Sequence, residues 1–296
     1  MPASSRSNLL LRALFLPAIA LASCRNSNPQ PLHDDPHLTP RIVLQDVTLH
    51  SDSLARDMQY RVILPATLPP NQKLPVLYLL HGGGGNFRDW SNYSDVDTFA
   101  ERGIILVMPE GHSSYYTNAA DRPADRYEDY ITKELIADVE HKFPAMPGRS
   151  GRAIVGVSMG GFGAVKLALV HPDLFAFAAG LSPALDVPSR PFSIKRIDQW
   201  RRFRAIFGPW QGEVQRNNDP LLLAKTADPG KTPYIFLACG EQEGLLAANN
   251  QFAARLKQRG FQFEYHTSRG NHDWSQWNSW LPSLSASLSQ HFPAKE

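Results

Sequence analysis

From residue 42 onward, short apolar runs alternate with segments in which apolar residues recur at helical spacing. This alternation predicts an α/β fold with a mostly parallel central sheet and helices on both faces. Two early runs, 42–49 and 58–64, alternate apolar with polar residues and are expected to be antiparallel edge strands. Continuously apolar strands are expected at 74–80, 104–108, 153–157, 174–181 and 234–238. Helices are expected at 127–143, 159–170, 246–259 and 274–292.

The alternation of strand and helix patterns is interrupted at residues 183–223. In this segment, aromatic residues lie among basic ones: Trp200, Phe203, Phe207 and Trp210. The segment is interpreted as a small cap insertion over a pocket, although an aromatic stripe of this kind also fits simple packing. The chain of 296 residues is otherwise long enough for one catalytic domain, expected at 41–296. Its 30 basic and 28 acidic residues leave a formal charge of +2, and no run of five like charges indicates a nucleic-acid partner.

The first 24 residues have the pattern of a secretory signal peptide. Arg6 and Arg12 precede an apolar stretch at 13–22 that is too short to span a bilayer. The sequence Leu-Ala-Ser-Cys that ends at Cys24 resembles the lipobox of bacterial lipoproteins, in which the cysteine carries the acyl chains. Residues 25–40 are polar and proline-rich, as in a flexible tether.

These features predict an exported lipoprotein of a bacterial cell envelope, anchored to the membrane through lipid on Cys24. An ordinary cleaved signal with an accidental cysteine is the alternative. If Cys24 is lipidated, the other cysteine, Cys239, is left without a disulfide partner.

A nucleophile elbow is indicated at Ser158, the centre of a G-x-S-x-G match that runs from Gly156 to Gly160. The bare motif occurs by chance in something like one chain in ten of this size, given the usual glycine content. Here it lies between an apolar strand and a helical segment, which is the context that the mechanism requires. Ser158 is therefore the predicted nucleophile.

A glycine run from Gly82 to Gly85 follows another apolar strand. Acyl transfer needs two backbone N–H groups that point at the oxyanion, and residues without side chains let the backbone approach the substrate. Gly83 and Met159 are the expected donors of this oxyanion hole. A phosphate-binding loop is the rival interpretation, but the run lacks the residues of either common phosphate motif. His81 is expected to support the loop.

His272 is the predicted general base, because hydrolases of this type place serine, acid and histidine in that order along the chain. Its neutral imidazole would accept the serine proton and return it to the leaving group. The acid is expected just after a strand, where Glu241 and Glu243 both qualify. Glu243 is favoured, Glu241 is the nearest rival, and Asp273 ranks third because it adjoins the base itself.

With these parts, residues 43–284 resemble the esterase D-like family of α/β-hydrolases. This family includes S-formylglutathione hydrolases, feruloyl and acetyl esterases, and mycolyltransferases. The likeness rests on the segments at 80–86 with Trp90, 108–111, 130–135, 156–161 and 270–274. Two positions depart from the family pattern: Asn271 stands where glycine is usual, and Glu243 where many members have aspartate. Matching Cys239 and Gly240 to the family segment places the acid at Glu243, and a glutamate serves in the mycolyltransferase branch.

The resemblance implies the α/β-hydrolase fold and a serine carboxylesterase that works through an acyl-serine intermediate, without metal or cofactor. An exported member is expected to act on a short or aromatic acyl group on a carbohydrate. The alternative in the same class is an acyltransferase that moves the acyl group to a sugar hydroxyl. The alternative from another class is a non-catalytic binding lipoprotein, which would be expected to have lost part of the catalytic set.

Overall fold

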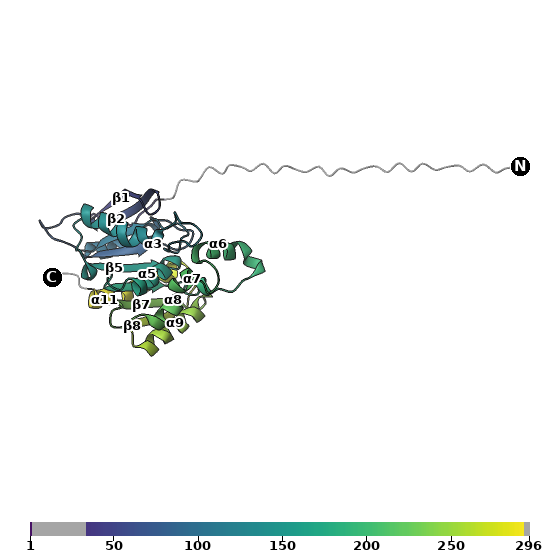
Figure 1. Cartoon of the computed structure of the whole chain (residues 1–296). Helices are drawn as coiled ribbons and strands as arrows, with labels where there is room; N and C mark the ends of the chain where they lie inside the picture. The colour runs from purple at the N-terminus through teal and green to yellow at the C-terminus, as the bar shows by residue number, and fades with distance from the viewer. Residues whose placement is uncertain (2–33, 293–296) are drawn as a thin grey trace. The chain divides into compact units, whose positions relative to one another are not determined.

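An eight-stranded sheet with strand order β1-β2-β4-β3-β5-β6-β7-β8 forms the centre of the computed structural model, which describes Met1 and residues 34–292 (Figure 1). The antiparallel pairs are β1 with β2 and β2 with β4, and the remaining neighbours are parallel. The strands are β1 Ile42–Ser51, β2 Arg56–Pro65, β3 Val76–Leu80, β4 Ile105–Pro109, β5 Arg152–Val157, β6 Phe177–Leu181, β7 Tyr234–Gly240 and β8 Phe263–Ser268. The expected α/β-hydrolase fold is thus confirmed.

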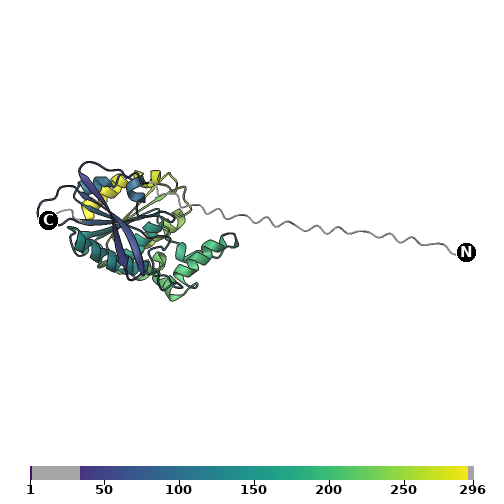
Figure 2. The same ribbon diagram turned by 90° about the horizontal axis from the view of Figure 1, so that it is seen from above.

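Helices cover both faces of the sheet (Figure 2). Because successive side chains of a strand point to opposite faces, Leu77 and Leu79 pack in one core while Val76 and Tyr78 pack in the other. The helices are α1 Asp89–Tyr93, α2 Asp97–Glu101, α3 Tyr127–Asp129, α4 Ile136–Lys142, α5 Met159–Val170, α6 Ile197–Phe207, α7 Glu213–Asn217, α8 Pro220–Thr226, α9 Leu246–Arg259, α10 Trp274–Ser279 and α11 Leu281–His291. Short 3₁₀ turns lie at η2 Arg149–Gly151, η3 Val187–Ser189 and η4 Ile194–Arg196.

Several element boundaries differ from those expected. The helix expected at 127–143 contains a π-helical stretch, η1 Tyr130–Leu135, between α3 and α4. The helix expected at 274–292 is divided into α10 and α11, with a proline in the first turn of α11. Strand β6 begins at Phe177, three residues later than expected. Strand β8 and the short helices α1 and α2 were not expected at all.

The N-terminal boundary also differs. The expected tether at 25–40 ends in residues that already contact the domain, because both carboxylate oxygens of Asp34 bind the guanidinium of Arg61 at 2.8 and 2.9 Å. The Arg61 side chain is only 1% exposed, so this ion pair is part of the packed structure. Residue 34 therefore already belongs to the folded domain. The expected signal peptide, Cys24 and the rest of the tether lie outside the described residues.

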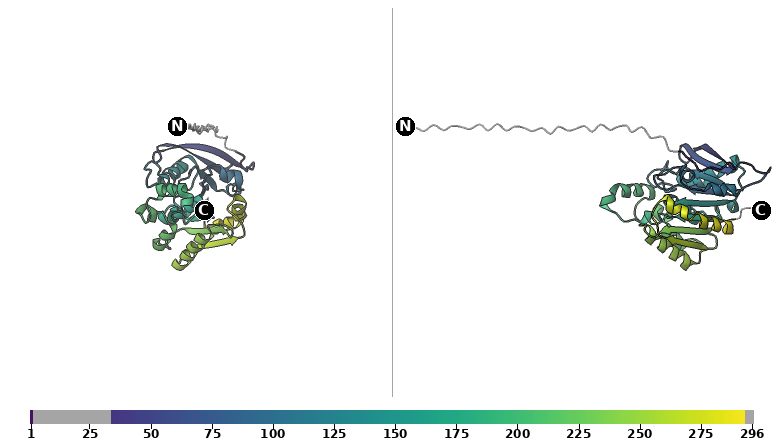
Figure 3. Two further views of the ribbon diagram at one scale, coloured as in Figure 1. Left: turned by 90° about the vertical axis from the view of Figure 1, so that its right-hand side faces the viewer. Right: turned by 180° about the vertical axis from the view of Figure 1, so that it is seen from behind.

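The segment at 183–223 connects β6 to β7 and contributes η3, η4, α6, α7 and the start of α8. Figures 1 and 3 show α6 projecting beyond one end of the sheet. Phe203, Ile206 and Phe207 form its buried side and pack with Phe162 of α5. Within the part of the chain that the structure describes, no helix is both long and apolar enough to cross a membrane.

Candidate active site

Ser158 lies in the sharp turn between β5 and α5. Its backbone has φ 54° and ψ −112°, a region that residues with side chains rarely adopt. Such a conformation costs on the order of 1–3 kcal/mol and persists where the surrounding structure imposes it. The turn sets Ser158 at the N-terminal end of α5, where the helix dipole favours developing negative charge.

The glycines on either side make this turn sterically feasible. A Cβ at Gly160 would lie 2.1 Å from the carbonyl oxygen of Leu80, and a Cβ at Gly156 would lie 2.2 Å from the backbone of Gly160. Neither position has room for any side chain, because both neighbours are backbone atoms that cannot move aside. The glycines of the motif are thus explained by close packing of β5, α5 and the end of β3.

The serine, histidine and glutamate form one continuous hydrogen-bonded chain. His272 Nε2 lies 2.8 Å from Ser158 Oγ, and His272 Nδ1 lies 2.6 Å from Glu243 Oε2. These distances agree with the arrangement expected from the sequence. His272 is carried by the loop between β8 and α10, and Glu243 by the loop that follows β7.

Contacts that the sequence did not reveal hold the Glu243 carboxylate in place. Its Oε1 accepts hydrogen bonds from Ser182 Oγ at 2.6 Å and from the Gly240 amide at 2.9 Å. Trp277 Nε1 donates to the same Ser182 hydroxyl at 3.1 Å, and its ring packs edge-on against the ring of His272. Because the Glu243 side chain is 1% exposed, water does not compete for these bonds.

The two rival acids are engaged elsewhere. Glu241 is exposed, and its carboxylate accepts a hydrogen bond from Thr267 at 3.3 Å. Asp273 caps the N-terminus of α10 by accepting a hydrogen bond from the Gln276 amide at 3.0 Å. The structure therefore brings Glu243, and neither rival, to the ring of His272.

Gly83 and Met159 lie side by side in the wall of the cavity above Ser158. A Cβ at Gly83 would lie 3.9 Å from Met159 Cβ, and a Cβ at Gly82 would lie 3.6 Å from Ser158 Cβ. Met159 is the first residue of α5, and the N–H groups of a helix's first turn have no partner within the helix. Gly83 and Met159 thus lie close together beside Ser158, and their role as the two oxyanion donors stays a prediction.

His81 supports the glycine loop, as expected. Its Nδ1 donates to the Gly82 carbonyl at 2.8 Å, and its Nε2 accepts from the Gly111 amide at 2.9 Å. Glu110 lies beside it at 3.2 Å. Burial opposes ionisation of Glu110, but the nearby His81 ring and the hydrogen bond from the His112 amide outweigh this effect and lower the pKa of Glu110. Trp90 further anchors the preceding strand through a 3.0 Å bond to the Leu80 carbonyl.

A cavity of about 530 Å³ opens at the reactive serine. The insertion at 183–223 forms part of its wall through Arg190 and through Gln199, Arg202, Phe203 and Ile206. The aromatic residues of this insertion differ in burial and in contact with the cavity. Phe203 and Phe207 are buried against Tyr115, whereas Trp210 is 53% exposed and lines no part of the cavity.

Cys239 is a free, fully buried thiol at the end of β7. Burial and the nearby Glu243 carboxylate raise the pKa of Cys239 to about 12, so the thiol stays protonated. Among residues 34–292, no three His, Cys, Asp or Glu side chains are grouped closely enough to hold a metal ion.

Fold and site together define an α/β-hydrolase of the serine hydrolase class. The chain belongs to the family described as "Putative esterase", whose model matches residues 51–288. This family of esterases includes acetyl and feruloyl esterases, S-formylglutathione hydrolases and the Ag85 mycolyltransferases.

Three relatives illustrate the range of the family. The chain is 26% identical over 255 residues to an acetyl esterase of Caldicellulosiruptor saccharolyticus, with 81% of this chain and 96% of that protein covered. It is 26% identical to the diacylglycerol acyltransferase/mycolyltransferase Ag85A of Mycobacterium leprae, with 74% and 76% covered. The solved structure of a ferulic acid esterase superposes with a TM-score of 0.72 at 25% identity, with 85% and 98% covered.

Proposed function

We propose that this protein is a serine carboxylesterase that hydrolyses a carboxylic ester through an acyl-serine intermediate. The observation that carries the proposal is the hydrogen-bonded chain from Ser158 through His272 to Glu243. If this chain of hydrogen bonds served only to stabilise the fold, its serine would not need to lie in a strained turn beside an open cavity.

The geometry accounts for each proton. The Glu243 carboxylate accepts the Nδ1 proton of His272, so the Nε2 lone pair faces the Ser158 hydroxyl. Ser158 Oγ attacks the ester carbonyl while Nε2 takes its proton, and the amides of Gly83 and Met159 stabilise the oxyanion. The imidazolium then protonates the departing alcohol. Water then attacks the acyl-serine with the same help from His272, which releases the acid and restores the serine.

The proposed substrate is an ester of a short or aromatic acyl group, carried by a carbohydrate. Similarity to an acetyl esterase and to a ferulic acid esterase supports this acyl range. Tyr115, Phe203 and Leu245 supply apolar walls beside Ser158, and the cavity of about 530 Å³ suits a small acyl group with part of its alcohol.

A fluorophosphonate probe and an ester panel test the proposal together. The probe should label Ser158, and Ser158→Ala should abolish both labelling and hydrolysis of 4-nitrophenyl acetate while the melting temperature is retained. Ser275→Ala, an exposed serine on α10, is the matched control and should behave like the wild type. A wild-type protein that neither reacts with the probe nor hydrolyses any ester would be a binding protein instead. A preference for long-chain acylglycerols would overturn the proposed acyl range.

Acyl transfer is the second candidate, because one relative is an acyltransferase. Water and a sugar hydroxyl compete for the same acyl-enzyme, so the two reactions differ only in the second step. Adding a polyol during turnover distinguishes them. Acylated polyol as the main product would establish a transferase, and free acid as the main product would establish a hydrolase.

We further propose that the protein is exported and anchored to a bacterial envelope membrane through lipid on Cys24. The signal-like segment at 1–24 and the lipobox-like end of this segment support the proposal. In a host that processes lipoproteins, the protein should fractionate with membranes, and Cys24→Ser should release it or block maturation. Mass spectrometry that found an unmodified Cys24 on the mature chain would contradict the anchor.

A further inference from the structure

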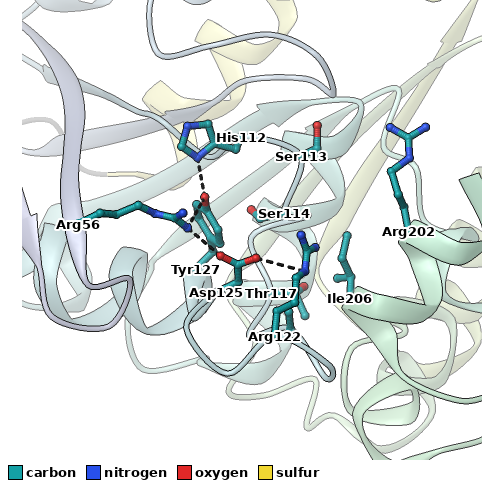
Figure 4. A pocket seen from close by; sticks show the side chains of 11 residues that line it. Arg56, His112, Ser113, Ser114, Thr117, Arg122, Asp125, Tyr127, Arg202 and Ile206 are labelled. Atoms are coloured by element: carbon teal, nitrogen blue, oxygen red, sulfur yellow. Dashed lines mark hydrogen bonds and ion pairs between the residues drawn. The ribbon is translucent and has the colours of Figure 1, made fainter. Parts of the chain in front are cut away.

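A second cavity, of about 410 Å³, adjoins the active-site cavity. The two cavities share Ser113, Arg202 and Ile206 in their walls, so they are direct neighbours, and a substrate bound at Ser158 that reached past these residues would enter the second cavity. The second cavity is lined mainly by polar side chains that come from β2, the loop at 112–127 and α6 (Figure 4).

Positive charge dominates this lining. Its guanidinium groups belong to Arg56, Arg122 and Arg202, and its carboxylate belongs to Asp125. Three cations and one anion leave a formal charge of +2. Asp125 lies between Arg56 and Arg122, at 2.7 and 3.2 Å, and so neutralises only part of their charge.

Arg202 faces this pair from the other wall. In Figure 4 it extends from α6 on the side opposite Arg56. Among the residues that the structure describes, Arg202 forms no ion pair. The Arg202 side chain is exposed between the two cavities, where its guanidinium is accessible to a ligand, and the planar fork of this group suits a carboxylate or phosphate.

The loop at 112–127, which supplies most of the residues that line this cavity, is held in a fixed and strained shape. His112, Tyr115 and Tyr116 have positive φ values of 44°, 55° and 51°, which side-chain-bearing residues rarely adopt. The buried Lys166 of α5 donates to the Tyr116 carbonyl at 2.8 Å, and Ser114 Oγ donates to the Gly111 carbonyl at 2.6 Å. Strain that is maintained in this way occurs mainly at binding and catalytic sites.

We propose that this second cavity binds the alcohol portion of the substrate and selects an alcohol that carries an anionic group, either carboxylate or phosphate. The inference rests on the proposed esterase function. The apolar walls at Tyr115 and Phe203 favour the acyl group in the first cavity, which leaves the charged second cavity for the more polar alcohol. The anionic group would bind between Arg202 and the Arg56–Arg122 pair.

The test compares acetylated sugars that carry or lack an anionic group. The substrates are an acetylated methyl glucuronoside, the same compound as its neutral methyl ester, and an acetylated methyl glucoside 6-phosphate, with acetate release as the readout. We expect kcat/KM at low salt to be about tenfold higher for at least one anionic substrate than for the neutral one. A tenfold ratio is at the low end of the contribution of a charge-assisted hydrogen bond, because the cavity is open to water. The preference should shrink as salt screens the charges. The favoured anion identifies the group.

Two variants should move this preference in opposite directions. Arg202→Gln should lower the ratio of anionic to neutral kcat/KM severalfold, whereas Asp125→Asn should raise it by releasing Arg56 and Arg122. Because each result is a ratio, a general loss of activity cancels. Arg255→Gln, on α9 and outside both cavities, is the matched control and should leave the ratio unchanged.

A binding measurement separates this inference from the esterase proposal. The deacetylated methyl glucuronoside, methyl glucoside and methyl glucoside 6-phosphate are titrated into the wild-type protein by calorimetry. Tighter, salt-sensitive binding of an anionic sugar supports the subsite even if no ester is hydrolysed. Equal affinities, or equal kcat/KM for charged and neutral esters, overturn the subsite even if the protein proves to be an active esterase.

Discussion

Glu243→Gln tests the role of the carboxylate with almost no change of shape. In the wild type, Oε2 accepts the Nδ1 proton of His272, and Oε1 accepts bonds from Ser182 and Gly240. A glutamine can keep the latter two bonds only through its carbonyl oxygen, which turns its NH₂ group toward His272. The NH₂ group then donates to Nδ1, so the ring proton moves to Nε2, and His272 can no longer accept the Ser158 proton.

The expected loss in kcat is about 10⁴-fold, the size seen when a serine hydrolase is left with the wrong histidine tautomer. At 1.36 kcal/mol for each factor of ten, this corresponds to about 5 kcal/mol of transition-state stabilisation. KM should change little, because the Glu243 side chain is 1% exposed and presents almost no surface to a substrate. The melting temperature should also change little, since the bonds to Ser182 and Gly240 survive.

Glu241→Gln is the matched control, because it makes the same change two residues away on the surface. Turnover of 4-nitrophenyl acetate and thermal melts should be measured for both variants and the wild type. The control should stay within about twofold of the wild type, as expected for a change outside the catalytic unit. Near-normal turnover by Glu243→Gln, or a large loss in Glu241→Gln, would refute the assignment of the acid.

Gly160→Ala should lower the melting temperature by about 5–10 °C, because its Cβ would lie 2.1 Å from the Leu80 carbonyl oxygen; an unchanged melt would contradict the packing. Asp273→Ala should cost about 1 kcal/mol by removing the cap of α10 while leaving kcat largely intact, as unfolding in urea and steady-state kinetics can check. Burial opposes ionisation of Glu128, but the charge of Lys166, together with hydrogen bonds from His171 and Lys166, outweighs it and lowers the pKa of Glu128 to about 2. Stability from this pair should therefore be complete above about pH 4.5, the usual range of the group, and be lost as the pH falls toward 2 in thermal melts. Glu128→Gln should remove that part of the acid sensitivity.

The catalytic elbow was predictable because its constraints are local. A strand, a tight turn and a helix occupy consecutive residues, and within this turn the backbone of Gly160 leaves no room for a side chain at Gly156. The parallel strands were predictable for a similar reason, since burial on both faces requires continuous apolar runs.

Strand β8 was missed because its residues lack this signal. Its sequence FEYHTS contains two aromatic residues among polar ones, and none of its side chains is fully buried. Among the described strands it forms the far edge of the sheet and pairs with β7 alone, so one of its two sides has no neighbouring strand there. The loop at 112–127 was missed for another reason. Its shape depends on contacts with the distant Lys166 and with α6, which no short window of sequence contains.

The two departures from the family pattern have physical explanations in the structure. Asn271 is exposed and is not among the residues with positive φ, so this position does not need a glycine. The glutamate at 243 folds back over Gly240, where a Cβ would lie 2.6 Å from Oε1, and accepts the Gly240 amide as it reaches His272. A side chain at residue 240 would occupy the space through which the carboxylate passes. The longer acid and the glycine three residues before it thus depend on each other, and together they place the carboxylate against His272.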